Sequence, residues 1–322
     1  YFKVPSVNLD FVHSGAAILD CVIGGGWPLG RIVNVVGDKS TGKTLLAIEA
    51  LTNFLRQYPE GKAHYAESEA AFNREYAQAL GLPLDRVEFP EGIDTVEQLF
   101  DDVTRALKDA DGGRILYVLD SLDALTDENE KGRDIRDGTY GTGKSKQMSQ
   151  LLRRLVRDVE RSKATVMIIS QVRDNIGATF GRKYTRSGGR ALDFYASVVV
   201  YLAHLGEIKR TVNGVKRTVG VSIKAKCTKN KVGLPFRECT FPIIFAYGIE
   251  DVTSSLDWLE ENGKLSDAGL SVKEAQGLRD RVRGGSLDGD ELKDVRLALS
   301  DTVKKAWTAI ETSFMPKKGK YT

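Results

Sequence analysis

The chain has 322 residues, of which 41% are hydrophobic and 28% are charged, and this composition excludes disordered and fibrous proteins. The length fits two domains, or one large domain with an appendage. The three cysteines lack Cys-x-x-Cys spacing and only three histidines occur, which argues against a disulfide framework and a structural zinc site. We therefore expect a reducing, cytoplasmic compartment. No apolar run approaches the ~18 residues that a membrane-spanning helix needs.

The net charge of +3 says little, but the charges are unevenly distributed along the chain. Residues 172–190 hold five lysines and arginines against one acid, and residues 207–231 hold eight against one. Residues 250–294 reverse this, with twelve acids against six bases. Segregated basic stretches are compatible with a surface that binds a polyanion, and a solvated charged surface is the alternative.

Strand and helix patterns alternate from residue 31 to residue 170. Short apolar, β-branched runs predict the strands, and apolar residues at helical spacing predict the helices. Such alternation is typical of a mostly parallel sheet with helices on both faces. We expect strands over 31–36, 63–66, 87–89, 114–119 and 165–170, and helices over 45–55, 70–80, 95–107 and 147–161.

The pattern changes after residue 196. The pair Asn213-Gly214 predicts a type I′ hairpin, and further strands over 222–226 and 238–245 predict an antiparallel extension of the sheet. Beyond residue 251 the strands stop, and apolar residues from Leu292 to Phe314 recur at helical spacing. We therefore predict an α/β fold with a mostly parallel twisted sheet flanked by helices, an antiparallel extension and a small C-terminal helical region. The expected boundaries are 1–11, 12–250 and 251–322.

A complete P-loop pattern, G-x-x-x-x-G-K-[ST], follows the first predicted strand and opens the first predicted helix. Its glycines allow backbone N–H groups to cradle phosphates at the N-terminus of that helix. We expect Lys43 to reach the β- and γ-phosphates and Thr44 to ligate Mg²⁺. The sequence therefore predicts a site for ATP and Mg²⁺. The predicted nucleotide-binding residues of the loop are Gly37, Asp38, Lys39, Ser40, Thr41, Gly42, Lys43 and Thr44.

Polar residues follow the ends of three other predicted strands. Asp120 is expected to hold Mg²⁺ beside Thr44. Glu67 and Glu69 follow another strand, where a carboxylate can polarise the attacking water. Alternate residues of a strand point the same way, so the local pattern does not choose between these two glutamates. Gln171 ends a third strand, and its amide suits a sensor of the γ-phosphate.

Two polar, glycine-rich stretches fit neither a strand nor a helix: 126–145 and 172–190. Both lie near the carboxyl ends of predicted strands, where open α/β sheets place their ligands. Long loops at such positions are usually functional.

The second of these stretches resembles the second DNA-binding loop of RecA-family recombinases. The similarity lies in the run S-Q-V-R-D-N-I-G-A-T-F-G over 170–181 and in G-G-R-A-L-D-F-Y-A-S-V over 188–198. In addition, Lys-Asn-Lys over 229–231, followed by Pro-Phe, resembles the interface strand of that family, and 26–33 matches the approach to its P-loop. The resemblance covers roughly residues 12–250 and extends to short phage-encoded members. Generic P-loop ATPases lack both the loop and the Lys-Asn-Lys element.

The resemblance implies a RecA-type P-loop ATPase core that acts in homologous recombination. It implies a helical filament of identical subunits on single-stranded DNA, pairing with double-stranded DNA, and DNA-dependent ATP hydrolysis. Residues 1–11 would form a polymerisation segment. Single-strand-binding or mediator proteins would be further partners. Two departures from the family pattern are Lys39, at a position that is acidic in bacterial members, and a longer, more basic first loop.

The resemblance also assigns roles to individual residues. Lys43, Glu69 as the catalytic glutamate and Gln171 as the switch glutamine would act in hydrolysis. Lys229 and Lys231 would reach the ATP of the adjacent subunit, and as alternate residues of a strand they should face the same way. Further assignments are Asn73 and Tyr76 at the adenine, and Phe194 at the subunit interface. The expected DNA-binding residues are Arg133, Arg136 and Lys144 in the first loop, and Arg173, Ile176, Gly177, Phe180, Arg182, Arg186, Gly188, Gly189 and Arg190 in the second.

Two other functions share parts of this pattern. A ring-forming motor, such as a replicative helicase, has the same core but would lack the glycine-rich second loop. A recombination mediator that uses ATP only for assembly would not need the full set of catalytic residues. The intact P-loop, Glu69, Asp120 and Gln171 favour a recombinase that hydrolyses ATP.

Overall fold

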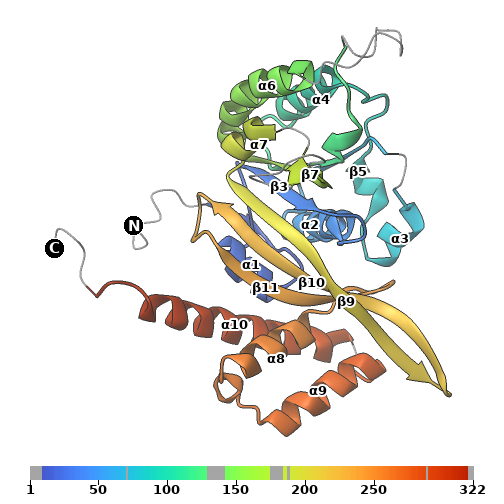
Figure 1. Cartoon of the computed structure of the whole chain (residues 1–322), viewed down its shortest axis with the longest axis vertical. Coiled ribbons are helices and arrows are strands. Elements are labelled where there is room, and N and C mark those ends of the chain that lie inside the picture. Colours follow the sequence, from blue (N-terminus) through green and yellow to red (C-terminus); the bar gives the residue numbers. More distant parts are fainter. Residues whose placement is uncertain are drawn as a thin grey trace.

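The computed structural model describes residues 9–69, 72–128, 142–174, 184–186, 189–287 and 289–317. A ten-stranded sheet crosses the molecule, with helices on both of its faces (Figure 1). Its strand order is β12-β11-β10-β9-β3-β7-β6-β4-β5, and β8 pairs with β7. The prediction of an α/β fold with a mostly parallel core and an antiparallel extension is confirmed.

The middle of the sheet is parallel and buried on both faces. Strand β3 (Ile32–Gly37) pairs with β7 (Ala164–Asp174) on one side and with β9 (Val198–Val212) on the other. Buried parallel strands are typically continuous runs of Val, Ile and Leu, as here. The carboxyl ends of these strands therefore meet at one edge of the sheet. The other parallel strands are β6 (Ile115–Asp120), β4 (Lys62–Glu67) and β5 (Val87–Glu88).

The two faces of the sheet are covered by different helices. Alternate side chains of β3 enter two separate buried clusters, Val33 and Val35 in one and Ile32 and Val36 in the other. The first cluster lies beneath α1 (Ala17–Ile23) and α2 (Lys43–Gln57), and the second lies beneath the remaining three helices of the core. Those three are α4 (Val96–Asp109), α6 (Thr142–Arg161) and α7 (Gly189–Tyr195), while α3 (Arg74–Ala79) and a small sheet of β1 (Phe11–Val12) and β2 (Trp27–Pro28) complete the core.

The antiparallel extension consists of β9, β10 (Val215–Asn230), β11 (Arg237–Ile244) and β12 (Gly248–Ile249). The predicted hairpin is confirmed, because Val212 pairs with Val215 across Asn213 and Gly214. Both turn residues have positive φ, 50° and 78°, as a type I′ turn requires.

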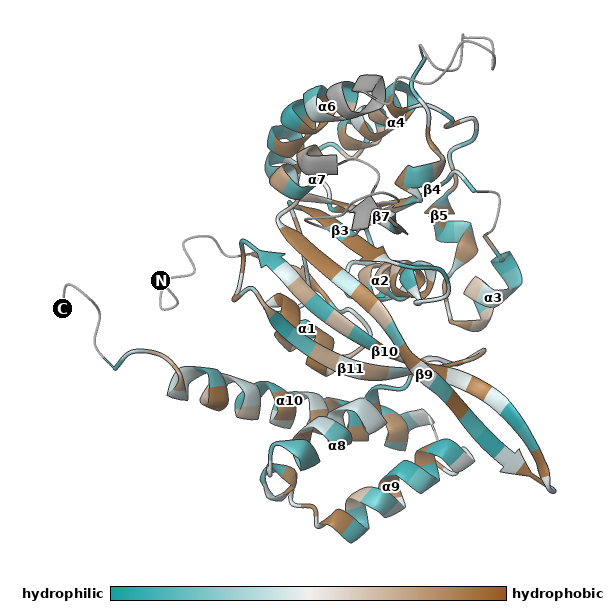
Figure 2. Ribbon diagram, in the orientation of Figure 1, coloured by the Kyte–Doolittle hydropathy of each residue, from teal (hydrophilic) through white to brown (hydrophobic). Residues whose placement is uncertain are grey.

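The outer part of this hairpin projects from the sheet. Strand β9 pairs with β3 only from Val198 to Leu202, and β11 pairs with β10 only from Gly220 to Cys227. Residues 209–218 therefore pair only with each other, and we call them the arm (Figure 1). Figure 2 shows β9 changing from hydrophobic within the sheet to mixed polar and apolar along the arm.

Beyond residue 250 the chain is helical, as predicted, with α8 (Asp251–Glu261), α9 (Val272–Gly284) and α10 (Gly289–Ser313). These helices share the core of the preceding α/β region, because Leu256 and Val303 belong to the same buried cluster as α1 and α2. The backbone N–H of Ala17 donates a hydrogen bond to Asp251 Oδ1 at 2.8 Å, which ties α1 to α8. The boundary at 250/251 thus separates strands from helices within one continuous core.

Several sequence-based boundaries need correction. Helix α3 begins at Arg74 rather than at residue 70, because Asn73 caps it by accepting a hydrogen bond from Tyr76 N at 2.8 Å. The stretch 172–190 is partly regular, since β7 continues to Asp174 and pairs with β8 (Tyr184–Arg186) before α7 begins. Helix α6 begins at Thr142, inside the expected loop 126–145, and Phe314 lies beyond α10 with 79% of its surface exposed. Among the residues described, no helix combines the length and apolarity needed to cross a bilayer.

Candidate active site

The P-loop lies where β3 ends and α2 begins, as the sequence predicts. Gly42 has a φ of 82°, in the left-handed region that favours glycine. Lys43 Nζ and Thr41 Oγ1 donate hydrogen bonds to Asp38 O at 2.7 and 2.8 Å. Burial lowers the pKa of the Lys43 ammonium, although the carboxylates around it, Asp120 foremost, oppose this. An anion beside Lys43 would reduce this unfavourable burial of charge.

A pair of oxygen atoms at the mouth of the loop fits a Mg²⁺ site. Thr44 Oγ1 donates a hydrogen bond to Asp120 Oδ2 at 2.6 Å, and Tyr65 Oη donates to the same oxygen at 2.7 Å. Burial raises the pKa of Asp120, while these two hydrogen bonds lower it. Mg²⁺ is usually held by one or two protein oxygens together with phosphates and water, which is what Thr44 and Asp120 offer. Among the described residues, no group of three or more His, Cys, Asp and Glu side chains forms an all-protein cage.

Glu69 and Gln171 lie side by side at the same edge of the sheet. Glu69 Oε1 accepts hydrogen bonds from Gln171 Nε2, at 2.7 Å, and from Ser121 Oγ. The backbone N–H of Gln171 donates to Asp123 Oδ2 at 2.6 Å. Gln171 of β7 is therefore held by the segment after β6 and by the segment after β4. A change at Glu69 would reach Gln171 through a single hydrogen bond.

The structure separates the two glutamates that the local pattern left equivalent. Glu67, the last residue of β4, accepts a hydrogen bond from the backbone N–H of Phe72. Glu69 lies beyond the strand and contacts Ser121 and Gln171 instead. Glu69 is thereby joined to Ser121, which follows Asp120, and to Gln171 of β7.

Asn73 and Tyr76, expected at the adenine, lie at the start of α3. The side-chain oxygen of Asn73 is used to cap that helix. Burial raises the pKa of the half-buried Tyr76 phenol, and the nearby Glu49 carboxylate on α2 adds to this shift. Tyr76 therefore lies beside the helix that the P-loop opens.

Lys229, Lys231 and Phe194 lie together at the inner end of β10. Lys229 Nζ donates hydrogen bonds to the carbonyl oxygens of Asp193 and Phe194, at 2.5 and 2.8 Å, at the C-terminus of α7. The Phe194 side chain is 70% exposed, as an interface residue would be in an isolated subunit. Strand β10 ends at Asn230, so Lys231 lies just beyond the strand and the alternation expected for the two lysines does not extend to it.

The structure describes few of the predicted DNA-binding residues. Arg133, Arg136, Ile176, Gly177, Phe180, Arg182 and Gly188 lie outside the described residues. Lys144 begins α6, Arg173 lies in β7, Arg186 lies in β8, and Gly189 and Arg190 begin α7, with their side chains outside the description. These backbone positions follow the carboxyl-terminal edge of the sheet that carries Gln171.

Three residues of the site were not identified from the sequence: Tyr65, Ser121 and Asp123. Tyr65 lies two residues before Glu67 on β4, so its spacing placed it on the same side of the strand. Ser121 and Asp123 lie one and three residues after the Mg²⁺ candidate Asp120. All polar residues that follow this apolar strand could have been predicted as site residues together. Their hydrogen-bond partners, however, come from segments far away along the chain.

The sequence profile of the RecA N-terminal domain matches residues 3–250 of this chain. The chain belongs to the RecA family. Protein RecA of Nostoc punctiforme is 35% identical over 257 residues, which are 80% of this chain and 69% of the relative. Protein RecA of Francisella philomiragia is 33% identical over 301 residues, covering 91% and 81% of the two chains. Protein RecA of Prochlorococcus marinus is 34% identical over 263 residues, or 82% and 69%.

Proposed function

We propose that this protein is an ATP-dependent recombinase that assembles as a helical filament on single-stranded DNA and carries out homologous pairing and strand exchange. Membership of the RecA family supports this function over a ring-forming motor or a mediator. The observation that carries it is the hydrogen bond between Glu69 and Gln171, because it joins the ATP end of the sheet to the strand that leads into the second DNA loop.

In this proposal, backbone N–H groups of the P-loop and the Lys43 ammonium bind the β- and γ-phosphates. Mg²⁺, held by Thr44 and Asp120, would neutralise phosphate charge when bound. Glu69 orients and polarises the attacking water, because its carboxylate lies beside the other polar groups at the ends of β4 and β6. Gln171 exchanges its contact with Glu69 for one with the γ-phosphate, and this change is passed to 172–190.

DNA binding in this proposal involves the two stretches at the carboxyl-terminal edge of the sheet. Their arginines and lysines would contact phosphates, and contacts confined to the backbone make binding independent of sequence. Ile176 or Phe180 would insert between bases, leaving base edges free to pair with a second strand. Phe194, Lys229 and Lys231 would contact the neighbouring subunit, with the two lysines near its ATP.

The test compares Glu69 with Glu67, which lies two residues earlier at the end of β4. Glu69→Gln should retain ATP binding and filament formation but lower DNA-stimulated hydrolysis by about 10²- to 10³-fold, since the amide cannot polarise water. Glu67→Gln is the matched control and should keep most of its activity, because its contact with Phe72 N needs only an acceptor oxygen. Phosphate release with and without single-stranded DNA measures the hydrolysis rate of each variant. Loss of hydrolysis in Glu67→Gln alone would move the catalytic role to Glu67.

A further inference from the structure

The backbone N–H of Gln171 lies beyond the end of the neighbouring strand β6. Strand β6 pairs with β7 only as far as Leu119 and Ile168, whereas Gln171 is three residues further along β7. On the opposite side β7 still pairs with β3, where Gly37 is the partner of Gln171. Backbone N–H groups in folded proteins need an acceptor. Strand β6 does not supply one for Gln171.

The acceptor on that side is the carboxylate of Asp123. Its Oδ2 accepts the hydrogen bond from Gln171 N at 2.6 Å. Asp123 lies in the short helical turn Leu122–Ala124 that follows β6, and both Leu122 and Leu125 are buried. A hydrogen bond to an ionised acceptor is roughly twice as strong as one between neutral groups. Asp123 therefore fixes the backbone just before the residues of β7 that pair with β8.

Gln171 is thus held at two points by two carboxylates, its amide by Glu69 at 2.7 Å and its backbone by Asp123. Burial lowers the pKa of the Lys43 ammonium, and Asp120 is the strongest of the carboxylates that oppose this shift. Glu69 and Asp123 also oppose it, so both lie near the ammonium that is proposed to bind the β- and γ-phosphates. Phosphate charge at that position would repel both carboxylates.

We propose that Asp123 is a positioning residue that makes ATP hydrolysis depend on DNA. By holding the backbone of Gln171, it keeps the Gln171 amide on Glu69, where the amide occupies an oxygen that would otherwise accept from the attacking water. The charge of the bound triphosphate weakens both contacts, and DNA bound to 172–190 completes the release. Gln171 then contacts the γ-phosphate, and Glu69 contacts the water. This inference rests on the roles proposed above for Glu69 and Gln171.

A purely structural role is the alternative, in which Asp123 does no more than satisfy the N–H of Gln171. A neutral acceptor would serve that purpose, as the side-chain oxygen of Asn73 does for Tyr76 N at the start of α3. A carboxylate instead adds negative charge beside the phosphate site, which by itself disfavours nucleotide binding. The charge has a use if it releases Gln171 when ATP binds.

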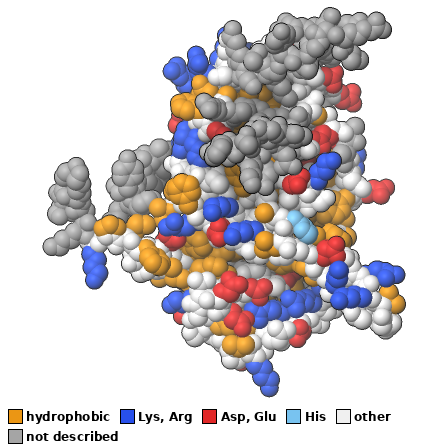
Figure 3. All heavy atoms as spheres, viewed as in Figure 1, with side chains coloured by type: hydrophobic (Ala, Val, Ile, Leu, Met, Phe, Trp, Pro, Cys, Tyr) orange, Lys and Arg blue, Asp and Glu red, His pale blue; other side chains and the backbone are white. Residues whose placement is uncertain are grey.

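The experiment compares two substitutions of Asp123 with a control. Asp123→Ala removes the acceptor and its charge, and Asp123→Asn keeps an acceptor oxygen without the charge. The control Asp101→Ala removes an exposed carboxylate from α4. Acidic and basic side chains are interspersed over the face shown in Figure 3, and the loss of one exposed charge from such a surface has little effect.

Three quantities are measured for each protein: ATP binding, ATP hydrolysis with and without single-stranded DNA, and hydrogen exchange without nucleotide in the peptide that contains Gln171. We expect Asp123→Ala to raise hydrolysis without DNA by about 10- to 100-fold, the range for losing a hydrogen bond to a charged group. The rate with DNA should stay near that of the parent, so the stimulation by DNA falls by the same factor. Asp123→Asn should show a smaller rise, and the control none. Exchange at Gln171 should be faster in Asp123→Ala.

Equal lowering of both hydrolysis rates in Asp123→Ala would overturn the inference in favour of a purely structural role. Exchange at Gln171 as slow as in the parent would also overturn it, because the backbone would then not be held by Asp123. A parent protein without DNA-stimulated hydrolysis would instead refute the proposed function. Faster exchange in Asp123→Ala would in that case still support Asp123 as the residue that positions Gln171.

Discussion

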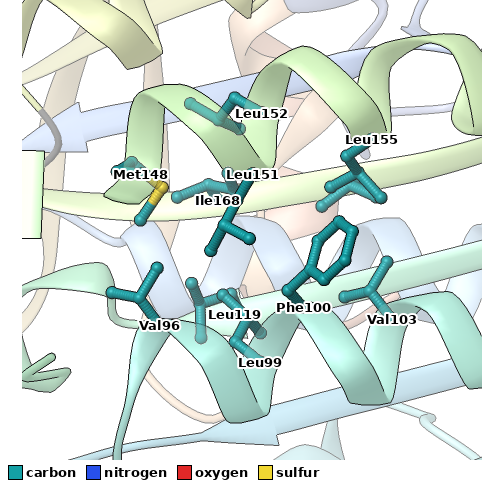
Figure 4. A pocket seen from close by; sticks show the side chains of 11 residues that line it. Val96, Leu99, Phe100, Val103, Leu119, Met148, Leu151, Leu152, Leu155 and Ile168 are labelled. Atoms are coloured by element: carbon teal, nitrogen blue, oxygen red, sulfur yellow. The ribbon is translucent and has the colours of Figure 1, made fainter. Parts of the chain in front are cut away.

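The face of the sheet beneath α1 and α2 and the face beneath α4 and α6 bury their side chains in two clusters of different extent. The first is one continuous buried cluster that extends into α8 and α10. The second contains a small, partly open pocket of about 20 Å³ that is lined by apolar side chains such as Leu99, Phe100, Met148 and Leu152 (Figure 4). This volume could hold a single water molecule, but an apolar lining offers water no hydrogen bonds.

In the proposed function, the two faces carry different sites. The P-loop precedes α2, which covers the first face. Helices α6 and α7 follow the two proposed DNA loops and cover the second face. A helix above a cavity loses fewer contacts when it shifts than a helix above a filled core. In the proposed function, the nucleotide would bind at the end of α2, and the DNA loops would lead into the face that contains the pocket.

The largest expected effect tests whether the active site is shared between neighbouring subunits. Lys43→Ala should lower ATP turnover by about 10³-fold, because the group that neutralises the phosphates is lost. Lys229→Ala/Lys231→Ala should also be inactive with DNA if these lysines reach the ATP of a neighbour. In an equal mixture, ~25% of head-to-tail interfaces would join two intact half-sites.

Activity should therefore return when the two inactive variants are mixed, and phosphate release measures it. Electron microscopy should first show that mixed filaments form. A mixture as inactive as its components would contradict a site shared between subunits, and full activity of the lysine variant alone would remove the pair from catalysis.

A matched pair of core substitutions tests the difference in packing directly. Leu51→Ala, beneath α2, should lower the free energy of unfolding by about 4 kcal/mol, whereas Leu152→Ala, beside the cavity, should lower it by about 3 kcal/mol. Both side chains are almost fully buried, so the difference reflects how many contacts each one makes. Urea denaturation of the two variants measures it. Equal losses, or a larger loss for Leu152→Ala, would show that the two faces are equally well packed.

The third expected effect concerns Asp251, a buried carboxyl group at the start of α8, next to α1. Burial raises the pKa of Asp251 to about 6, and the charge of Asp20 adds to this shift. The folded protein therefore holds the proton more tightly than the unfolded chain, whose pKa is about 4. The stabilisation is complete below pH ~4 and is lost as the pH rises through ~6.

Asp251→Asn should accordingly unfold with a free energy up to about 3 kcal/mol higher than the parent at pH 8, since the amide oxygen can still accept from Ala17 N. The advantage should shrink steadily between pH ~6 and ~4. Denaturation curves across this pH range measure it. An advantage that does not change with pH would mean that the pKa of Asp251 is the same in the folded and unfolded protein.

Much of this architecture was predictable because its signals are local. The P-loop, the alternation of strands and helices and the turn at Asn213-Gly214 each depend on residues close together in the chain. The order of strands depends on pairing between distant segments, so the position of β3 between β7 and β9 could not be read from its own residues. The hairpin of β7 and β8 was missed for the same reason, since β8 is short and only Val172–Asp174 of β7 pairs with it.

The site shows the same limit. Glu67 and Glu69 are equivalent in a strand pattern, and their separation depends on Phe72, Ser121 and Gln171. The family resemblance pointed to Glu69 because a match over the whole domain fixes the position of a residue relative to distant segments. For Lys229 and Lys231 simple alternation does not apply because β10 ends between them, and no residue type at that position signals this end.

The length of β9 has a mechanical consequence. One continuous strand pairs with β3 beside the P-loop and ends at the turn of the arm. From Leu202 to Val212 it extends about 33 Å, at roughly 3.3 Å per residue. A tilt of about 5° at its base would therefore move the tip by about 3 Å, comparable to the length of a hydrogen bond. Strand β9 is thus a lever, and small rotations near the nucleotide are enlarged at its outer end.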